Sequence, residues 1–195
     1  MEKVLTTHRM VVRRAGVADA EFIHRLWKNP DVMHFVGFPK GLAISVDEVR
    51  GQIETSPDSE FGSRLIAELL EAETPIGQCK LGAIDADGVC EPDIKLKPAY
   101  WGNGYGKELW IALVDYAFTH SSAKVVQGTP NRDNLASVRM QMGAGMVKVD
   151  EGVFESHTEM HPGAVPVPYY KLQITREQWK SRREMQSDPK EETAT

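Results

Sequence analysis

The sequence predicts a single domain of the α+β (mixed α/β) class, with helices and strands mixed along the chain. The chain has 195 residues, which is enough for one domain with a substantial core. Segments in which apolar residues recur at helical spacing alternate with segments that have the character of strands. A glycine cluster at residues 102–106 lies between a predicted strand and a long predicted helix. We place the domain at residues 1–180 and assign residues 181–195, which lack apolar periodicity, to a poorly ordered polar tail.

The first part of the chain contains a predicted strand at residues 9–14 and a helix that ends at Asn29-Pro30. Ser45 and Glu48 have the spacing of a capping box, which predicts the start of a second helix. The remaining predicted elements are strands at 63–70, 76–84 and 89–96, a helix at 107–120, a strand at 124–128, a helix at 134–142, strands at 146–149 and 169–174, and a short helix capped by Thr175.

Composition excludes several classes of function. The net charge is −5 at pH 7, so we expect no nucleic-acid partner, which would require clustered Lys and Arg. Cys79 and Cys90 have neither a zinc spacing nor a disulfide framework, and the six histidines have no metal spacing, so no metal site is predicted. No uncharged apolar stretch approaches the ~20 residues that span a bilayer, and the first ten residues lack the apolar region of a signal peptide. We therefore expect a cytoplasmic protein with no membrane partner.

The glycine cluster is the most informative stretch of the sequence. Glycines allow a positive φ and a close approach of the backbone to a ligand, and the N-terminus of the following helix presents unpaired N–H groups. Together these features predict a site for a phosphate or diphosphate. The spacing does not match a P-loop, because Trp101 and Glu108 occupy key positions, and it does not match the Rossmann fingerprint. A tight glycine turn that only starts a helix is the alternative.

Residues 100–106, Tyr-Trp-Gly-Asn-Gly-Tyr-Gly, resemble the acetyl-CoA pyrophosphate loop of GNAT N-acetyltransferases. Trp101 takes the place of the usual Arg or Gln, as in the Rim-type branch, which includes ribosomal-protein N-terminal acetyltransferases, and Gly104 and Gly106 are the two small residues. A second block, residues 134–146, resembles the Asn-x-x-Ser helix of the family. Weaker matches at 9–14, 29–33 and 170–179 extend the resemblance over residues 9–180.

The resemblance implies a central mixed sheet flanked by helices, whose fourth and fifth strands splay apart to hold acetyl-CoA as co-substrate. Three contacts are expected: main-chain groups of a strand bind the pantetheine arm, the glycine loop binds the diphosphate, and polar side chains at the start of a helix face the cofactor. The residues carried over for these contacts are Ile94, Lys95 and Leu96 for the arm, Trp101, Gly102, Asn103, Gly104, Tyr105, Gly106 and Lys107 for the loop, and Asn134 and Ser137 for the helix. For Asn134, an N-cap is the alternative interpretation.

The implied reaction is transfer of an acetyl group to an amine, by direct attack within a ternary complex. The amine must first lose a proton, and a carboxylate is suited to accept it. Glu91 is the first candidate for this base and Asp93 the second, since both project to one side of a strand; solvated surface carboxylates are the alternative. Pro92 between them predicts a bulge or an irregular opening. Gln141 stands where many family members have a proton-donating Tyr.

Two functional hypotheses follow for the chain. The first is an acetyl-CoA-dependent N-acetyltransferase whose acceptor is a small-molecule amine or a protein N-terminus, with a homodimer as a possible assembly. The second is a non-catalytic acyl-CoA-binding or sensing module, which Gln141 and the ambiguous base favour. The proline-rich segment 157–168 either borders the acceptor site or is a rigid connector.

Overall fold

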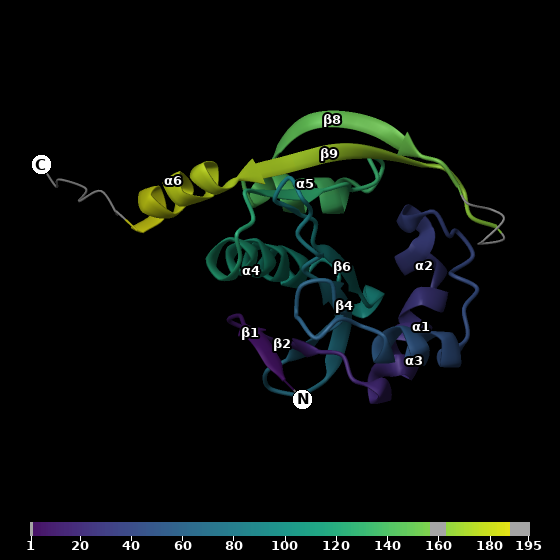
Figure 1. Ribbon diagram of the computed structural model, residues 1–195. Helices are drawn as coiled ribbons and strands as arrows, with labels where there is room; N and C mark the ends of the chain where they lie inside the picture. Colours follow the sequence, from purple (N-terminus) through teal and green to yellow (C-terminus); the bar gives the residue numbers. More distant parts are fainter. Residues whose placement is uncertain (1, 157–162, 188–195) are drawn as a thin grey trace, which may run out of the picture.

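The computed structural model describes residues 2–156 and 163–187 (Figure 1). Over these ranges the strands form a five-stranded sheet with the order β1-β2-β3-β4-β6 and a four-stranded sheet with the order β5-β7-β9-β8. The strands are β1 (Lys3–Thr6), β2 (Met10–Arg14), β3 (Leu65–Leu69), β4 (Pro75–Lys80), β5 (Val89–Cys90), β6 (Asp93–Leu96), β7 (Val125–Gly128), β8 (Val147–Phe154) and β9 (Val167–Thr175). Within the first sheet all pairs are antiparallel, whereas β5 and β7 are parallel.

The helices pack in two groups around these sheets. They are α1 (Ala20–Lys28), α2 (Pro30–Met33), α3 (Val46–Glu54), α4 (Tyr105–His120), α5 (Leu135–Gly143) and α6 (Arg176–Ser187), with 3-10 turns η1 (Val17–Asp19), η2 (His34–Val36) and η3 (Pro98–Tyr100). In Figure 1, α1, α2 and α3 lie together on one side of the molecule, and they share a buried cluster with Ile66 of β3. The buried face of α4 joins strands of both sheets in a second, larger core.

The strand predicted at residues 89–96 is divided between the two sheets. Val89 and Cys90 pair with β7 in the second sheet, and Asp93–Leu96 pairs with β4 in the first. The division falls at Glu91-Pro92, where proline has no N–H to donate to a ladder. A continuous strand was therefore the wrong prediction, whereas the irregular opening expected at Pro92 is present. As a result β6 and β7, the fourth and fifth strands of the expected fold, diverge, which confirms the mixed α/β fold class.

The last helix is longer than the sequence predicts. Thr175 and Gln178 form the expected reciprocal cap, but α6 continues past residue 180 to Ser187, into the segment assigned to a disordered tail. Contacts with α4 explain the difference: the Trp179 indole N–H donates to Asp115 over 2.6 Å, and Arg183 pairs with the same carboxylate at 3.3 Å. Such contacts stabilise a helix whose own pattern is weak. Residues 188–195 lie outside the described residues.

Candidate active site

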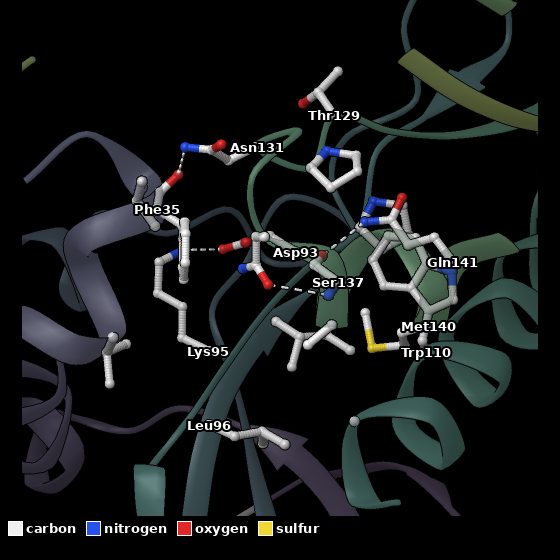
Figure 2. A pocket seen from close by; sticks show the side chains of 18 of the residues that line it. Phe35, Asp93, Lys95, Leu96, Trp110, Thr129, Asn131, Ser137, Met140 and Gln141 are labelled. Atoms are coloured by element: carbon white, nitrogen blue, oxygen red, sulfur yellow. Dashed lines mark hydrogen bonds and ion pairs between the residues drawn. The ribbon is translucent and has the colours of Figure 1, made fainter. Parts of the chain in front are cut away.

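A cavity of about 1110 Å³ lies where β6 and β7 diverge. Figure 2 shows side chains from β6, α4 and α5 converging on it, with α2 and η2 on the far side. Most of the predicted site residues line this cavity. They are Glu91, Asp93, Ile94, Lys95, Leu96, Trp101, Gly102, Gly104, Gly106, Lys107, Asn134 and Ser137, together with Gln141. The sequence therefore located the cavity, although it did not reveal all of its walls.

The glycine loop forms one end of the cavity. Gly102 and Gly104 have φ values of +76° and +79°, a region that other residues occupy only at a cost. The 16-residue helix α4 begins directly after them at Tyr105, so its free N–H groups and Lys107 of its first turn lie at this end. Gly106 serves packing instead: a Cβ there would lie 3.2 Å from Met140 Sδ of α5. The end is suited to a diphosphate.

Of the loop residues predicted to contact the cofactor, Asn103 and Tyr105 are not among those that line the cavity. Both contact Arg9 of the β1–β2 connection, Asn103 through its backbone carbonyl and Tyr105 through its ring. The Arg9 guanidinium donates to the Asn103 carbonyl over 3.0 Å and stacks over the Tyr105 ring, 4.1 Å from its centroid. It also pairs with Glu108 at 2.7 Å. Arg9 therefore supports the loop from behind, a role that the sequence did not indicate because 94 positions separate the two.

Glu108 is the centre of this support. Its carboxylate accepts from Thr7 Oγ1 at 2.6 Å and from the backbone N–H of Arg9 at 2.8 Å, in addition to the Arg9 side chain. Burial would raise the pKa of Glu108, but the hydrogen bonds from Thr7 and Arg9 and the charge of Arg9 outweigh it and lower the pKa. The ionised carboxylate thus fixes the first turn of α4 to the N-terminal hairpin.

Glu91 lies at the apex where the sheets separate. Its two carboxylate oxygens accept from Thr129 Oγ1 at 2.5 Å and from Gln127 Nε2 at 3.2 Å, so its side chain reaches from the start of β6 to the end of β7. Burial and the charge of Glu91 raise the pKa of Cys90 to about 12, and burial also raises the pKa of Cys79. Neither thiol is a thiolate at neutral pH, so neither is suited to carry an acyl group.

Asp93 and Lys95 of β6 form an ion pair, and both residues line the cavity. Lys80 is the cross-strand partner of Asp93 on β4. Burial opposes ionisation of Asp93, but the charge and hydrogen bond of Lys95, with help from Lys80 and a backbone N–H, lower its pKa. Asp93 is therefore a weaker base than an isolated aspartate.

The start of α5 supplies the third wall. Asn134 is the N-cap of this helix, and its side chain accepts from the Ser137 backbone N–H at 3.1 Å. This is the N-cap role that the sequence offered as the alternative to a contact with the cofactor. Gln141 is buried; its Nε2 donates to Ser137 Oγ over 3.3 Å, and its Oε1 has no partner among the described residues. Gln141 packs so closely on Gly128 that a Cβ on that glycine would lie 2.0 Å from Oε1.

Sequence reasoning missed most of the side of the cavity that faces α5; of its residues, only Val167 belongs to a segment, 157–168, that was offered as a border of the acceptor site. Its residues come from the helical region after α1, from the β7–α5 connection and from the β8–β9 hairpin, and they are Val32, Phe35, Val36, Thr129, Asn131, Phe154 and Val167. In Figure 2, Phe35 and Asn131 lie across the cavity from Met140 and Gln141, with Asp93 between them and Lys95 on the side of Phe35. None of these positions has a local motif that could have identified it. Residues 157–162 of the proline-rich segment lie outside the described residues.

Comparison with known proteins agrees with this geometry. The family model described as acetyltransferase (GNAT) domain matches residues 9–147. The chain belongs to the GNAT acetyltransferase family. It is an N-acetyltransferase that uses acetyl-CoA as co-substrate.

Several relatives are similar over most of their length. An uncharacterized N-acetyltransferase of Bacillus licheniformis is 22% identical over 174 residues, which cover 87% of this chain and 96% of the relative. The FsC-acetyl coenzyme A-N(2)-transacetylase of Aspergillus fumigatus is 27% identical over 193 residues, with 91% and 78% covered. The structure of spermidine N-acetyltransferase from Vibrio cholerae with CoA and spermine has a TM-score of 0.74 at 21% identity, covering 88% of this chain and 98% of that one.

Two further findings concern the described part of the chain only. No helix there is both long and apolar enough to cross a membrane. No group of three or more His, Cys, Asp or Glu side chains within those residues is arranged to hold a metal ion.

Proposed function

We propose that the chain transfers the acetyl group of acetyl-CoA to a primary amine by direct attack, while both substrates occupy the cavity between β6 and β7. The observation that carries this proposal is the placement of two features in one cavity: the glycine loop at one end and the Glu91 carboxylate at the apex. β6 is an edge strand of the first sheet, so its outer edge is open to hydrogen-bond an extended pantetheine arm. The loop N–H groups and Lys107 would bind the diphosphate.

Glu91 is our candidate for the base. An ammonium has no lone pair, so the acceptor amine must give up a proton before its nitrogen bonds to the acetyl carbon and the carbon–sulfur bond breaks. The hydrogen bonds from Thr129 and Gln127 hold Glu91 in one orientation at the apex. Asp93 is the weaker candidate because Lys95 and Lys80 lower its pKa. Gln141 has no acidic proton, so water would carry to the departing thiolate the second proton that the nitrogen loses once it has bonded to the acetyl carbon.

The acceptor is a small amine or a protein N-terminus. Solved structures of similar fold include proteins named for each: a spermidine N-acetyltransferase, and a RimL ribosomal alpha-N-protein acetyltransferase in complex with CoA, with a TM-score of 0.72 at 14% identity. At these identities the likeness concerns the fold, so the choice between the acceptors depends on the cavity of this chain.

Thermal unfolding with acetyl-CoA, CoA and ATP tests the cofactor end. A ligand that binds only the folded state raises the free energy of unfolding by ~2.7 kcal/mol at a hundredfold excess over its Kd, which is several degrees of Tm. We expect a rise with acetyl-CoA and CoA but not with ATP. No rise at millimolar acetyl-CoA would contradict the proposal.

The Glu91→Gln variant tests the base. We expect kcat at pH 7 to fall by ~100-fold or more, because proton transfer loses its acceptor. The loss should shrink as the pH rises toward the pKa of the amine, where the free base forms without help. Asp93→Asn is the matched control and should retain more activity at pH 7. If kcat of the wild type and of Glu91→Gln instead depends on pH in the same way, Glu91 is not the base, and its role is to hold β6 and β7 in place through its hydrogen bonds.

A further inference from the structure

The end of the cavity beyond Asp93 has an apolar wall. It is lined by Val32, Phe35 and Val36 of α2 and η2 together with Phe154 and Val167 of the β8–β9 hairpin. Val36 is 41% exposed and Phe154 49%, although both belong to a cavity wall. We call these five residues the apolar wall. Such surface is suited to the carbon skeleton of a ligand, which would remove it from water.

The apolar wall is held in place before any ligand binds. The Val165 N–H donates to the Gly37 carbonyl over 2.8 Å, which joins the end of η2 to the start of β9. Asn131 Nδ2 donates to the Phe35 carbonyl at 3.3 Å, the contact drawn as a dashed line in Figure 2. A site fixed in this way loses little conformational entropy when a ligand binds. The ligands that it prefers are then set by the apolar character of the wall.

Two of the carboxylates that line the cavity are already engaged. Among the described residues, three of them line it: Asp31, Glu91 and Asp93. Glu91 accepts hydrogen bonds from two side chains, and Asp93 is paired with Lys95 and lies opposite Lys80. Asp31 is exposed at the rim, where an ion pair contributes little.

A polyamine needs a carboxylate for each ammonium that it brings out of water, because an unpaired buried charge is costly. With Glu91 serving the reacting nitrogen, the second ammonium of a polyamine would meet Lys80, Lys95 and the apolar wall. We propose that the acceptor is a monoamine with an apolar carbon skeleton, whose nitrogen lies at Glu91 and whose skeleton lies against the apolar wall. This inference rests on the proposed function and names its acceptor class.

A comparison of two amines tests the inference. The probes are 2-phenylethylamine, which has one ammonium and an aromatic body, and spermidine. Release of CoA gives kcat/KM for each, and calorimetry in the presence of CoA gives the binding of each without turnover. We expect kcat/KM for 2-phenylethylamine to be at least tenfold higher and its binding tighter. Equal values, or a preference for spermidine, would overturn the inference.

A variant sharpens the test. Val36→Asp adds a carboxylate to the apolar wall, so kcat/KM should fall several-fold for 2-phenylethylamine and rise for spermidine, with the Kd of acetyl-CoA unchanged. Val17→Asp is the matched control, because Val17 is similarly exposed, at 43%, and does not line the cavity. Tm values verify that both variants fold. Unchanged selectivity in Val36→Asp would contradict the role of the wall.

The failures of the two proposals are distinguishable. If acetyl-CoA raises Tm but neither amine is acetylated, the acceptor class is wrong while the cofactor end stands. If acetyl-CoA does not raise Tm, the proposed function fails, and the acceptor class fails with it.

Discussion

The two ends of the cavity, which we propose to bind the cofactor and the acceptor, are built in different ways. The cofactor end comes mainly from one continuous stretch, residues 94–107, and it offers backbone N–H groups that glycines make accessible. The acceptor end collects side chains from α2, η2, β4, β6 and the β8–β9 hairpin, which are far apart in sequence. A site made of backbone groups has a local motif, whereas a site made of distant side chains has none.

This difference predicts where each end is vulnerable. The cofactor end depends on loop conformation and on whatever supports the loop from behind. The acceptor end depends on how segments from different parts of the chain pack against each other. A substitution that disturbs one end should therefore leave binding at the other end nearly unchanged. If a single substitution weakens binding of both acetyl-CoA and the acceptor, the two ends are coupled.

The largest effect is expected for Gly37→Ala at the acceptor end. Gly37 has a φ of +96°, and a Cβ there would lie 2.8 Å from Val167 Cγ2 and 3.0 Å from the Val165 carbonyl oxygen. Backbone strain and overpacking together should lower the free energy of unfolding by ~2–4 kcal/mol. The KM of the acceptor should rise while the Kd of acetyl-CoA stays within about twofold. Denaturant unfolding and initial rates measure these quantities.

The control for Gly37→Ala is Gly51→Ala in α3. A Cβ at Gly51 would meet nothing within 4 Å, so this substitution should stabilise the helix by ~0.5–1 kcal/mol. If acetyl-CoA binding weakens in Gly37→Ala as much as acceptor binding does, the two ends are not independent.

A smaller effect is expected for Arg9→Ala at the cofactor end. The substitution removes the ion pair with Glu108 and the donor to the Asn103 carbonyl. Because Arg9 is partly exposed, we expect a loss of only ~1–2 kcal/mol in the free energy of unfolding. The Kd of acetyl-CoA should rise several-fold, with the acceptor KM unchanged. Arg25→Ala, which removes an exposed pair with Glu21, should change neither quantity. Equal effects of Arg9→Ala on both substrates would refute a role confined to the loop.

The smallest effect concerns pH and Glu108. Its folded-state pKa lies below the ordinary value, so its ionisation stabilises the fold above the unfolded-state pKa of ~4.3, and this contribution is lost as the pH falls through the lowered folded-state pKa. Glu108→Gln should therefore have a lower free energy of unfolding than wild type at pH 7. We call this difference the gap, and it should narrow by about 1 kcal/mol or less between pH 5 and pH 3. Denaturant unfolding across this range measures the gap. A gap that stays constant would show that the Glu108 charge contributes nothing.

Many elements of the fold were predictable because their causes are local. The capping box of Ser45 and Glu48 begins α3 as predicted, and both reciprocal hydrogen bonds are present. The positive φ of Gly145 follows the end of α5, as a C-terminal glycine predicts. The extension of α6 to Ser187 was not predictable, because it depends on contacts of Trp179 and Arg183 with α4.

The candidate site divides in the same way. The sequence located the glycine loop and Asn134, and it noted that Pro92 interrupts a strand. It did not predict that Arg9 contacts the Asn103 carbonyl and the Tyr105 ring, since these contacts join positions that are far apart in the chain. Nor did it predict the apolar wall, whose members share a cavity only after the two sheets have packed on α4.

By itself, the sequence determined the α+β class, most of the element order and the place of the glycine loop, because periodicity, caps and glycine conformations act over a few residues. Only the tertiary structure decided which carboxylates are engaged, what supports the loop and what the acceptor meets. Those properties depend on contacts between residues that are far apart in the chain. Their partners, and hence the charges and pKa values at the site, exist only in the folded state.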